Sequence, residues 1–246
     1  MRDNFSEQAA EYSKYRPTYP DEMIDYVVSL VSDKNTALDI ATGNGQVAVK
    51  LAKHFKEVYA TDISEEQLKN AASADNIKYQ KGSAEDTGFD KHAFDLVVVA
   101  QAIHWFDFDK FYKEVKRILK KKDGILAVMG YGLFSTNADS DEILRKFYNQ
   151  VLGPYWDPER RFLDDDYETI PFPLEEIQSE KFASSYEWSL EQLIGYLETW
   201  SAVQHYKKEN NSSPVDAIRD ELRESWEKSD KKIIFPMLLR IGKFKK

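Results

Sequence analysis

The 246-residue chain contains no cysteine, which excludes a disulfide scaffold, a thiolate metal site and a cysteine nucleophile. No stretch approaches the roughly 20 apolar residues that a membrane-spanning helix needs. Residues Met1 to Asn4 begin no apolar signal segment. The chain also has no internal repeat and no low-complexity tract. We therefore expect a soluble, cytoplasmic globular protein, and nothing in the sequence requires a metal ion.

Basic residues are also fewer than acidic residues. The chain has 34 Lys and Arg residues against 43 Asp and Glu residues, a formal net charge of −9. Non-specific binding to nucleic acid depends on Lys and Arg side chains that neutralise phosphates, so this balance argues against it. We expect a monomer or homodimer that binds neither nucleic acid nor membrane, and whose partner is a small molecule.

The part of the chain between residues 36 and 130 alternates short apolar runs with helical patterns. The expected strands are Thr36–Ile40, Glu57–Asp62, Ile77–Gln80, Phe94–Ala100 and Ile125–Met129. The expected helices are Gln46–Phe55, a helix capped by Ser64, and Asp107–Leu119. Strands and helices that alternate at this spacing predict an α/β fold with a doubly wound, mostly parallel sheet.

The pattern changes on both sides of this segment. We expect a single domain with an N-terminal helical cap over residues 1–35, a core over 36–130, an insertion over 131–215, and a final helix and strand over 216–246. Further predicted elements are helices over residues 139–152 and 190–206, a loop over 153–173, and strands over 182–188 and 233–242. Pro236 has no N–H for a ladder, which suits a sheet edge or the start of a strand.

The loop Asp39–Gly45 follows the first expected strand and opens the first helix. Its glycines allow the backbone to approach a ligand closely. Asp62 ends the second strand, 17 residues after Gly45, where its carboxylate can accept hydrogen bonds from both ribose hydroxyls of an adenosine. Doubly wound sheets bind ligands at this edge, so a nucleoside-bearing cofactor is favoured over a tight turn followed by an unrelated aspartate.

The same loop also fits a loose dinucleotide fingerprint, Gly43-x-Gly45-x-x-Ala48. Asp39 and Glu85 add two carboxylates to the expected neighbourhood of Asp62. Carboxylates repel a pyrophosphate and attract an ammonium group. We therefore expect a cationic, phosphate-free adenosine ligand such as S-adenosylmethionine rather than a dinucleotide.

With these motifs the chain resembles the class I S-adenosylmethionine-dependent methyltransferases, over roughly Phe5 to Gly130. The resemblance implies a Rossmann-like sheet of seven strands with the last one reversed, N-terminal helices, and a helical insertion that covers the active site. It places Asp39, Ala41, Gly43 and Gln101 along the methionine part of the cofactor, Asp62 and Ile63 at the ribose and adenine, and Ala84 and Glu85 beside the adenine. The family usually has glycine where this chain has Ala41. An alanine there needs only an ordinary φ, so we expect the turn to survive.

Two segments together carry a resemblance to a narrower group within this family. The first segment is residues 5–20, which contain Tyr12 and the run Tyr15-Arg16-Pro17, and the second is residues 100–107, with the sequence AQAIHWFD. Together they resemble the methyltransferase type 11-like small-molecule branch that includes trans-aconitate methyltransferases. In that branch Tyr12 and Arg16 would close over the cofactor. Arg16 would pair with the methionine carboxylate.

His104 follows the fourth strand, beside the expected position of the methyl group. It is a candidate general base, with an ordinary pKa of ~6.5, and equally a candidate for an orienting residue. A base is needed only where the methylated atom carries a proton at neutral pH. A carboxylate acceptor needs none, whereas a phenol or an amine does.

The acceptor site should be lined by aromatic residues, for which Trp105, Tyr131, Trp200 and Tyr206 are the candidates, although core packing is the commoner role of such side chains. An anionic acceptor would need a local cation, with Arg160, Arg161, Lys207 and Arg240 as candidates. Such an acceptor would approach a protein of net charge −9 against its average field.

The sequence thus predicts S-adenosylmethionine-dependent methyl transfer to a small-molecule acceptor, with a carboxylic acid among the candidates. Two alternatives remain open. The first is an NAD-dependent oxidoreductase, although the chain has no evident Tyr-x-x-x-Lys or His/Asp hydride relay. The second is a domain that binds the cofactor without catalysis and serves as a regulator.

Overall fold

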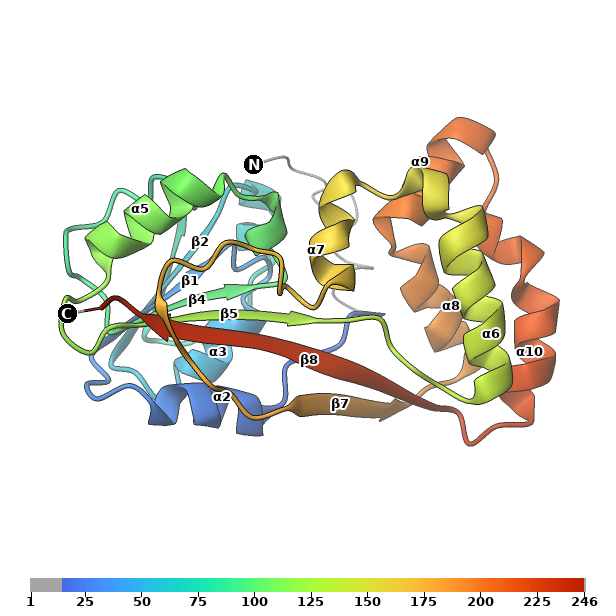
Figure 1. Cartoon of the computed structure of the whole chain (residues 1–246), viewed down its shortest axis with the longest axis horizontal. Coiled ribbons are helices and arrows are strands. Elements are labelled where there is room, and N and C mark those ends of the chain that lie inside the picture. The colour runs from blue at the N-terminus through green and yellow to red at the C-terminus, as the bar shows by residue number, and fades with distance from the viewer. Residues whose placement is uncertain (1–14, 246) are drawn as a thin grey trace.

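The computed structural model describes residues 15–245, and within them eight strands form one mixed sheet (Figure 1). The strand order is β3-β2-β1-β4-β5-β8-β6, and β7 also pairs with β8. The strands are β1 (Thr36–Ile40), β2 (Glu57–Asp62), β3 (Ile77–Lys81), β4 (Leu96–Ala100), β5 (Ile125–Tyr131), β6 (Glu175–Ile177), β7 (Phe182–Glu187) and β8 (Lys232–Lys243). The first five are parallel, and β8 runs antiparallel to β5. The predicted mostly parallel sheet with a reversed last strand is confirmed.

The prediction of seven strands missed one. The long strand β8 pairs with β7 over its first half and with β6 over its second half, so two short strands share one side of it. Strand β6 has the sequence Glu-Glu-Ile, which carries no apolar alternation that would reveal it.

Helices cover both faces of the parallel strands (Figure 1). Alternate side chains of β1 point to opposite faces, as strand geometry requires. Leu38 belongs to a core with Phe111 and Val115 of α5 (Phe108–Ile118). Ala37 belongs to the core on the other face, together with side chains of α2 (Asp21–Ser29) and α3 (Gln46–Leu51). The short helix α4 (Glu65–Lys69) follows β2, and the Oγ of Ser64 accepts a hydrogen bond at its start, as predicted.

A helical lobe lies beyond the carboxyl end of β5 and the amino end of β8 (Figure 1). Its helices are α6 (Ala138–Lys146), α7 (Arg161–Asp164), α8 (Leu190–Glu198), α9 (Ser201–Asn210) and α10 (Arg219–Glu227). The single helix predicted over residues 190–206 is wrong, because the chain leaves helical geometry at Trp200 and divides into α8 and α9. The predicted loop over residues 153–173 contains two 3-10 turns and α7.

Pro236 lies inside β8 rather than at an edge or at the start of the strand. The pairing of β5 with β8 ends at Tyr131 and Met237. Strand β5 therefore ends at the point where the missing N–H of Pro236 would have weakened its hydrogen bonding to β8.

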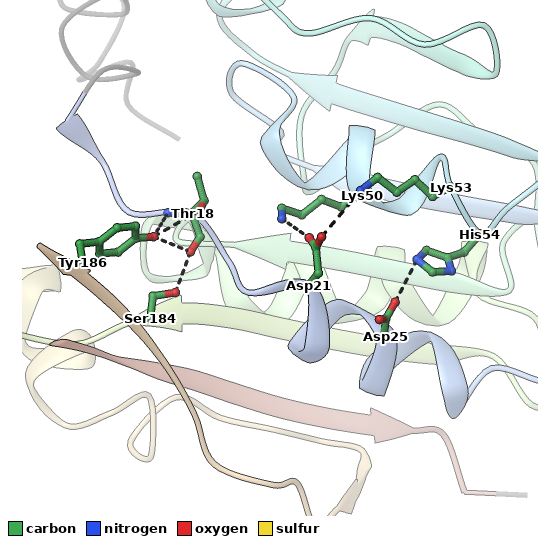
Figure 2. A network of polar contacts seen from close by, with 8 residues as sticks. All are labelled: Thr18, Asp21, Asp25, Lys50, Lys53, His54, Ser184 and Tyr186. Carbon is green, nitrogen blue, oxygen red and sulfur yellow. Dashed lines mark hydrogen bonds and ion pairs between the residues drawn. The ribbon is translucent and has the colours of Figure 1, made fainter.

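The segment before α2 contacts β7, and α2 itself contacts α3 and the turn after α3 (Figure 2). On one side, the Thr18 amide donates to the Tyr186 hydroxyl at 2.9 Å, and the Ser184 hydroxyl donates to the Thr18 carbonyl at 3.0 Å. On the other side, Asp21 of α2 pairs with Lys50 of α3, and Asp25 lies 3.2 Å from Nε2 of His54. These contacts fix the path of residues 16–20 across the carboxyl edge of the sheet.

None of the helices within residues 15–245 is long and apolar enough to cross a membrane. The same residues hold no group of three or more His, Asp or Glu side chains arranged to bind a metal ion.

Candidate functional site: two adjoining pockets

A cavity of about 130 Å³, here called the first pocket, opens at the carboxyl ends of β1, β2 and β4. It is walled by the loop after β1, the end of β2, the start of α4, the segment after β4, and residues of the N-terminal segment and β5. The lining residues are Arg16, Pro17, Tyr19, Asp39, Ala41, Thr42, Gly43, Asn44, Gln46, Val47, Asp62, Ile63, Ser64, Gln67, Ala100, Gln101, Ala102, Trp105 and Tyr131.

The loop after β1 has left-handed backbone conformation at three residues: Ala41 (φ +56°), Gly43 (φ +56°) and Gly45 (φ +82°). The expectation that Ala41 would need only an ordinary φ is wrong. A side chain with Cβ is disfavoured in this region, so Ala41 carries a conformational cost that glycine would not. At Gly45 a Cβ would also collide with the hydroxyl of Tyr79.

Asp62 is held in place by the backbone of the loop. Its Oδ2 accepts a hydrogen bond from the Gly43 amide at 2.9 Å, and its Oδ1 accepts one from the Ser64 amide at 2.9 Å. A carboxylate oxygen has two lone pairs and can accept more than one hydrogen bond. The side chain at the end of β2 is therefore oriented before any ligand binds.

Asp39 is fully buried beside the same loop. Its Oδ2 accepts a hydrogen bond from the Thr42 hydroxyl at 2.5 Å, while Oδ1 has no hydrogen-bond partner in the described part of the chain. Burial, opposed in part by Thr42 and reinforced by the charge of Asp62, raises the pKa of Asp39 to about 7. A cation placed at this wall would stabilise the ionised carboxylate.

Arg16 ties the first pocket to the helical lobe. Its Nη1 donates to the Tyr131 hydroxyl at 3.0 Å, and its Nη2 donates to the Thr199 carbonyl at 3.0 Å. Tyr131 ends β5, whereas Thr199 lies between α8 and α9. The guanidinium therefore spans the boundary between the sheet and the lobe.

A second, narrower pocket of about 40 Å³ adjoins the first and shares Arg16, Gln101 and Trp105 with it. The rest of its wall comes from the segment after β4, from the segment around α7, and from the start of α9. These residues are His104, Trp156, Asp157, Arg160, Leu163, Trp200 and Ser201.

His104 lies in this second pocket as a buried side chain. Its Nδ1 is 3.3 Å from the Tyr167 hydroxyl. Burial, together with the nearby charge of Arg160, lowers the pKa of His104 to about 3. The imidazole is therefore neutral at pH 7, and it is a much weaker base than an ordinary histidine.

Arg160 supplies a cation to the second pocket. Its Nε donates to the Tyr148 hydroxyl at 2.7 Å and to Asp164 at 3.2 Å, and its guanidinium lies over the Trp156 ring at 4.8 Å from the centroid. Burial alone would lower the pKa of Arg160, but Tyr148 and Asp164 raise it above its usual value. Neither Nη group donates a hydrogen bond to a described residue, so the planar end of the side chain can bind a ligand.

The predicted residues divide into three groups by position. Arg16, Asp39, Ala41, Gly43, Asp62, Ile63 and Gln101 line the first pocket, as do Trp105 and Tyr131. His104, Trp200 and again Trp105 line the second pocket. Tyr12 lies outside the described residues.

Ala84 and Glu85 do not line either pocket. Ala84 is buried in the core on the α5 face, and Glu85 accepts a hydrogen bond from the Asp107 amide at 3.2 Å. Their role beside the adenine stays a prediction.

Tyr206 lies outside both pockets, against Tyr155 at a ring-centroid distance of 5.0 Å, and its place in the acceptor site stays a prediction. Of the four candidate cations only Arg160 lines a pocket. Lys207 pairs with Glu198, Arg240 pairs with Glu176, and the Arg161 guanidinium lies over the Phe162 ring.

Several lining residues were not predicted. Asn44, Gln46 and Gln67 adjoin predicted positions, and their place in or near the loop could have indicated them. Asp157 and Leu163 come from a segment that was predicted as a loop, and no local pattern reveals them.

The charges of the first pocket fit a cationic ligand better than a pyrophosphate. Its lining contains two carboxylates, Asp39 and Asp62, and Arg16 is its one basic side chain within the described residues. The two acids can accept hydrogen bonds from ribose hydroxyls and from an ammonium group, and Arg16 can donate to a carboxylate.

Comparison with known proteins gives a consistent result. A family model described as "Methyltransferase domain" matches residues 38–128. A Dictyostelium discoideum protein assigned as a methyltransferase is 34% identical over 250 residues, covering 98% of this chain and 95% of the relative. A Saccharomyces cerevisiae protein assigned as an S-adenosylmethionine-dependent methyltransferase is 25% identical, covering 88% of this chain and 87% of its own. Among solved structures, a protein from Anaeromyxobacter dehalogenans assigned as a type II methyltransferase has a TM-score of 0.85 and 31% identity, over 93% of this chain and 98% of that one.

Proposed function

Because the chain belongs to the class I S-adenosylmethionine-dependent methyltransferases, we propose that it methylates a carboxylate group of a small molecule held in the second pocket. S-adenosylmethionine would occupy the first pocket, with Asp62 at the ribose hydroxyls, Asp39 near the ammonium group and Arg16 near the methionine carboxylate. The product of the cofactor is S-adenosylhomocysteine. When bound, the cofactor supplies a methyl group that is already activated for displacement.

The observation that carries the proposal is the pairing of Arg160 with His104 in the second pocket. Arg160 offers free guanidinium donors of the geometry that binds carboxylates. His104, with a pKa of about 3, is poorly suited to remove a proton from a phenol or an ammonium group. A pocket that offers guanidinium donors, and whose histidine is a weak base, favours a nucleophile that is already ionised at pH 7.

The chemistry balances without a proton transfer. A carboxylate oxygen of the acceptor would form a bond to the methyl carbon while the carbon–sulfur bond breaks, and the electron pair of that bond would stay on sulfur. An anion and a sulfonium cation become a neutral ester and a neutral thioether. Loss of opposite charges is favoured where water is excluded, and the tryptophans of the second pocket provide such surroundings.

Arg16, Gln101 and Trp105 line both pockets, so the reacting atoms would meet where these three side chains lie. The protein contributes alignment and exclusion of water, which can supply ~7–11 kcal/mol of the barrier reduction in well-oriented reactions. His104 would then act as a neutral residue that orients the acceptor.

The test compares acceptors and two neighbouring arginines. Release of S-adenosylhomocysteine is measured with panels of carboxylic acids, phenols and amines, and methyl esters are identified by mass and by cleavage in alkali. Arg160→Gln should lower kcat/KM for an active acid by about tenfold to a hundredfold. Arg161→Gln, next in sequence and outside both pockets, should leave kcat/KM unchanged.

If the protein methylates phenols or amines and no carboxylic acid of the panel, the proposed acceptor class is overturned. Tight binding of S-adenosylhomocysteine without turnover of any panel member would instead favour the regulator that binds the cofactor without catalysis.

A further inference from the structure

The second pocket contains a carboxylate that the proposed function does not use. Asp157 lines the pocket, and its Oδ2 is buried and accepts no hydrogen bond from any described residue. A buried carboxylate oxygen without a donor is costly, and proteins normally satisfy such groups. An unused acceptor atom in the wall of a pocket indicates that a ligand supplies the donor.

Asp157 and Arg160 reach the pocket from the same short turn. Pro158 begins a 3-10 turn that ends at Arg160, and the Arg160 amide donates to the Asp157 carbonyl at 2.9 Å. Within the described residues the two side chains form no ion pair with each other, because Arg160 pairs with Asp164 instead. One turn therefore presents the two Nη groups of Arg160 and the unpaired Oδ2 of Asp157 to the same small cavity.

We propose that the acceptor is a zwitterion of the amino-acid type, whose carboxylate binds Arg160 and whose ammonium group donates to Asp157. This inference rests on the proposed function and names the acceptor class more narrowly. The pocket wall supports it further, since Trp105, Trp156 and Trp200 present aromatic surface that tolerates a cation.

The net charge of the protein independently favours a zwitterionic acceptor. A molecule of net charge −9 repels an anionic acceptor, whereas a zwitterion carries no net charge and meets no such barrier. An acid without an ammonium group would also leave Asp157 unpaired beside its own negative charge. Selection of the zwitterion therefore follows from repulsion of the simple acid as well as from attraction of the amine.

The experiment uses acids that share a carbon skeleton and differ in one group. Phenylalanine, phenyllactate and phenylpropanoate form one series, and leucine, α-hydroxyisocaproate and isocaproate form another. Methyl transfer by the full chain is measured as kcat/KM, and binding of each acid to the protein saturated with S-adenosylhomocysteine is measured by calorimetry. We expect the amino acid to exceed the parent acid by about tenfold to a hundredfold, with the hydroxy acid between them.

In Asp157→Asn, kcat/KM for the amino acid should come within about threefold of kcat/KM for the parent acid, because the variant keeps the size of the side chain and removes its charge. Asp165→Asn, outside the pocket, should leave the ratio of these two values unchanged. The ratio is a property of specificity that a general loss of stability does not alter. If Asp157→Asn does not fold, the ratio in the wild-type protein decides the question alone.

The outcomes separate the two proposals. Equal or better use of the parent acid by the wild-type protein overturns the zwitterion while the carboxylate acceptor stands. A preference for the hydroxy acid over the amino acid also overturns it, in favour of a neutral donor at Asp157. If no acid of any series binds or reacts, and Arg160→Gln changes no measured acceptor, the proposed function fails with it.

Discussion

The first and second pockets share three side chains and differ in how they are built. The first pocket is formed largely by residues close together in sequence, at the ends of neighbouring parallel strands, with acids oriented by backbone amides. The second pocket gathers side chains from segments that are a hundred residues apart, such as His104 and Trp200. A cofactor site of the first kind follows from local sequence and sheet geometry, whereas an acceptor site of the second kind depends on tertiary packing.

The largest expected effect tests the first pocket alone. Asp62→Ala removes the carboxylate that would hold the ribose and should weaken binding of S-adenosylhomocysteine by about a hundredfold, measured by calorimetry. Glu85→Gln provides the contrast, because Glu85 lies outside the pocket lining. Full binding by Asp62→Ala would break the assignment of the first pocket, and a large loss with Glu85→Gln would restore the adenine contact predicted from the sequence.

A second, smaller effect concerns the pH dependence of cofactor binding. Asp39 has a pKa of about 7 in the folded protein against an ordinary value of 3.8, so it is largely protonated below pH 7. Binding of an ammonium group requires the ionised form, and affinity should fall by up to about tenfold per pH unit as the pH drops below 7. Calorimetry in buffers of different ionisation enthalpy would detect the released proton.

The same residue affects stability in the opposite sense. Because the folded state holds the proton of Asp39 more tightly than the unfolded state, its contribution to stability is lost as the pH rises from about 4 to about 7. Asp39→Asn should therefore stabilise the free protein by on the order of 1–3 kcal/mol at pH 8 and change it little at pH 4. A variant that binds the cofactor like wild type, with an unchanged pH profile, would show that Asp39 has no such role.

The smallest expected effect concerns the backbone of the loop. Ala41 has φ +56°, a conformation in which glycine has no Cβ penalty. Ala41→Gly should raise the free energy of unfolding by about 0.5–1 kcal/mol, measured by urea denaturation. Ala138→Gly, at the exposed first residue of α6, should not raise it. A loss of stability with Ala41→Gly would mean that packing of the Ala41 methyl outweighs the backbone cost.

The sequence was sufficient for the parts of the structure that depend on local pattern. The strands that end at Ile40 and Asp62 follow from their apolar runs, and the position of the loop between β1 and α3 follows from its glycines. The backbone of Ala41 did not follow, because an alanine gives no sign of a left-handed conformation imposed by its neighbours.

The second pocket was predicted less well for a related reason. Arg160 was one of four candidate cations, and sequence alone could not rank it above Arg161, which is adjacent. Their different surroundings arise from the 3-10 turn and from packing on Trp156, both of which depend on the fold of the lobe. Tyr206 belongs to α9, whose first residue Ser201 lines the second pocket, but the Tyr206 ring packs on Tyr155 instead.

The reversed strand β8 has a consequence for folding kinetics. It lies between β5 and the pair β6 and β7, although it follows all of them in the chain. Every residue of β5 is buried in the finished sheet, so one side of an apolar strand stays without its neighbour until β8 docks. Pairing between segments this far apart in sequence is slow, and an unpaired apolar edge is open to association with other chains. The interval before β8 docks is therefore the stage at which this chain is most exposed to aggregation.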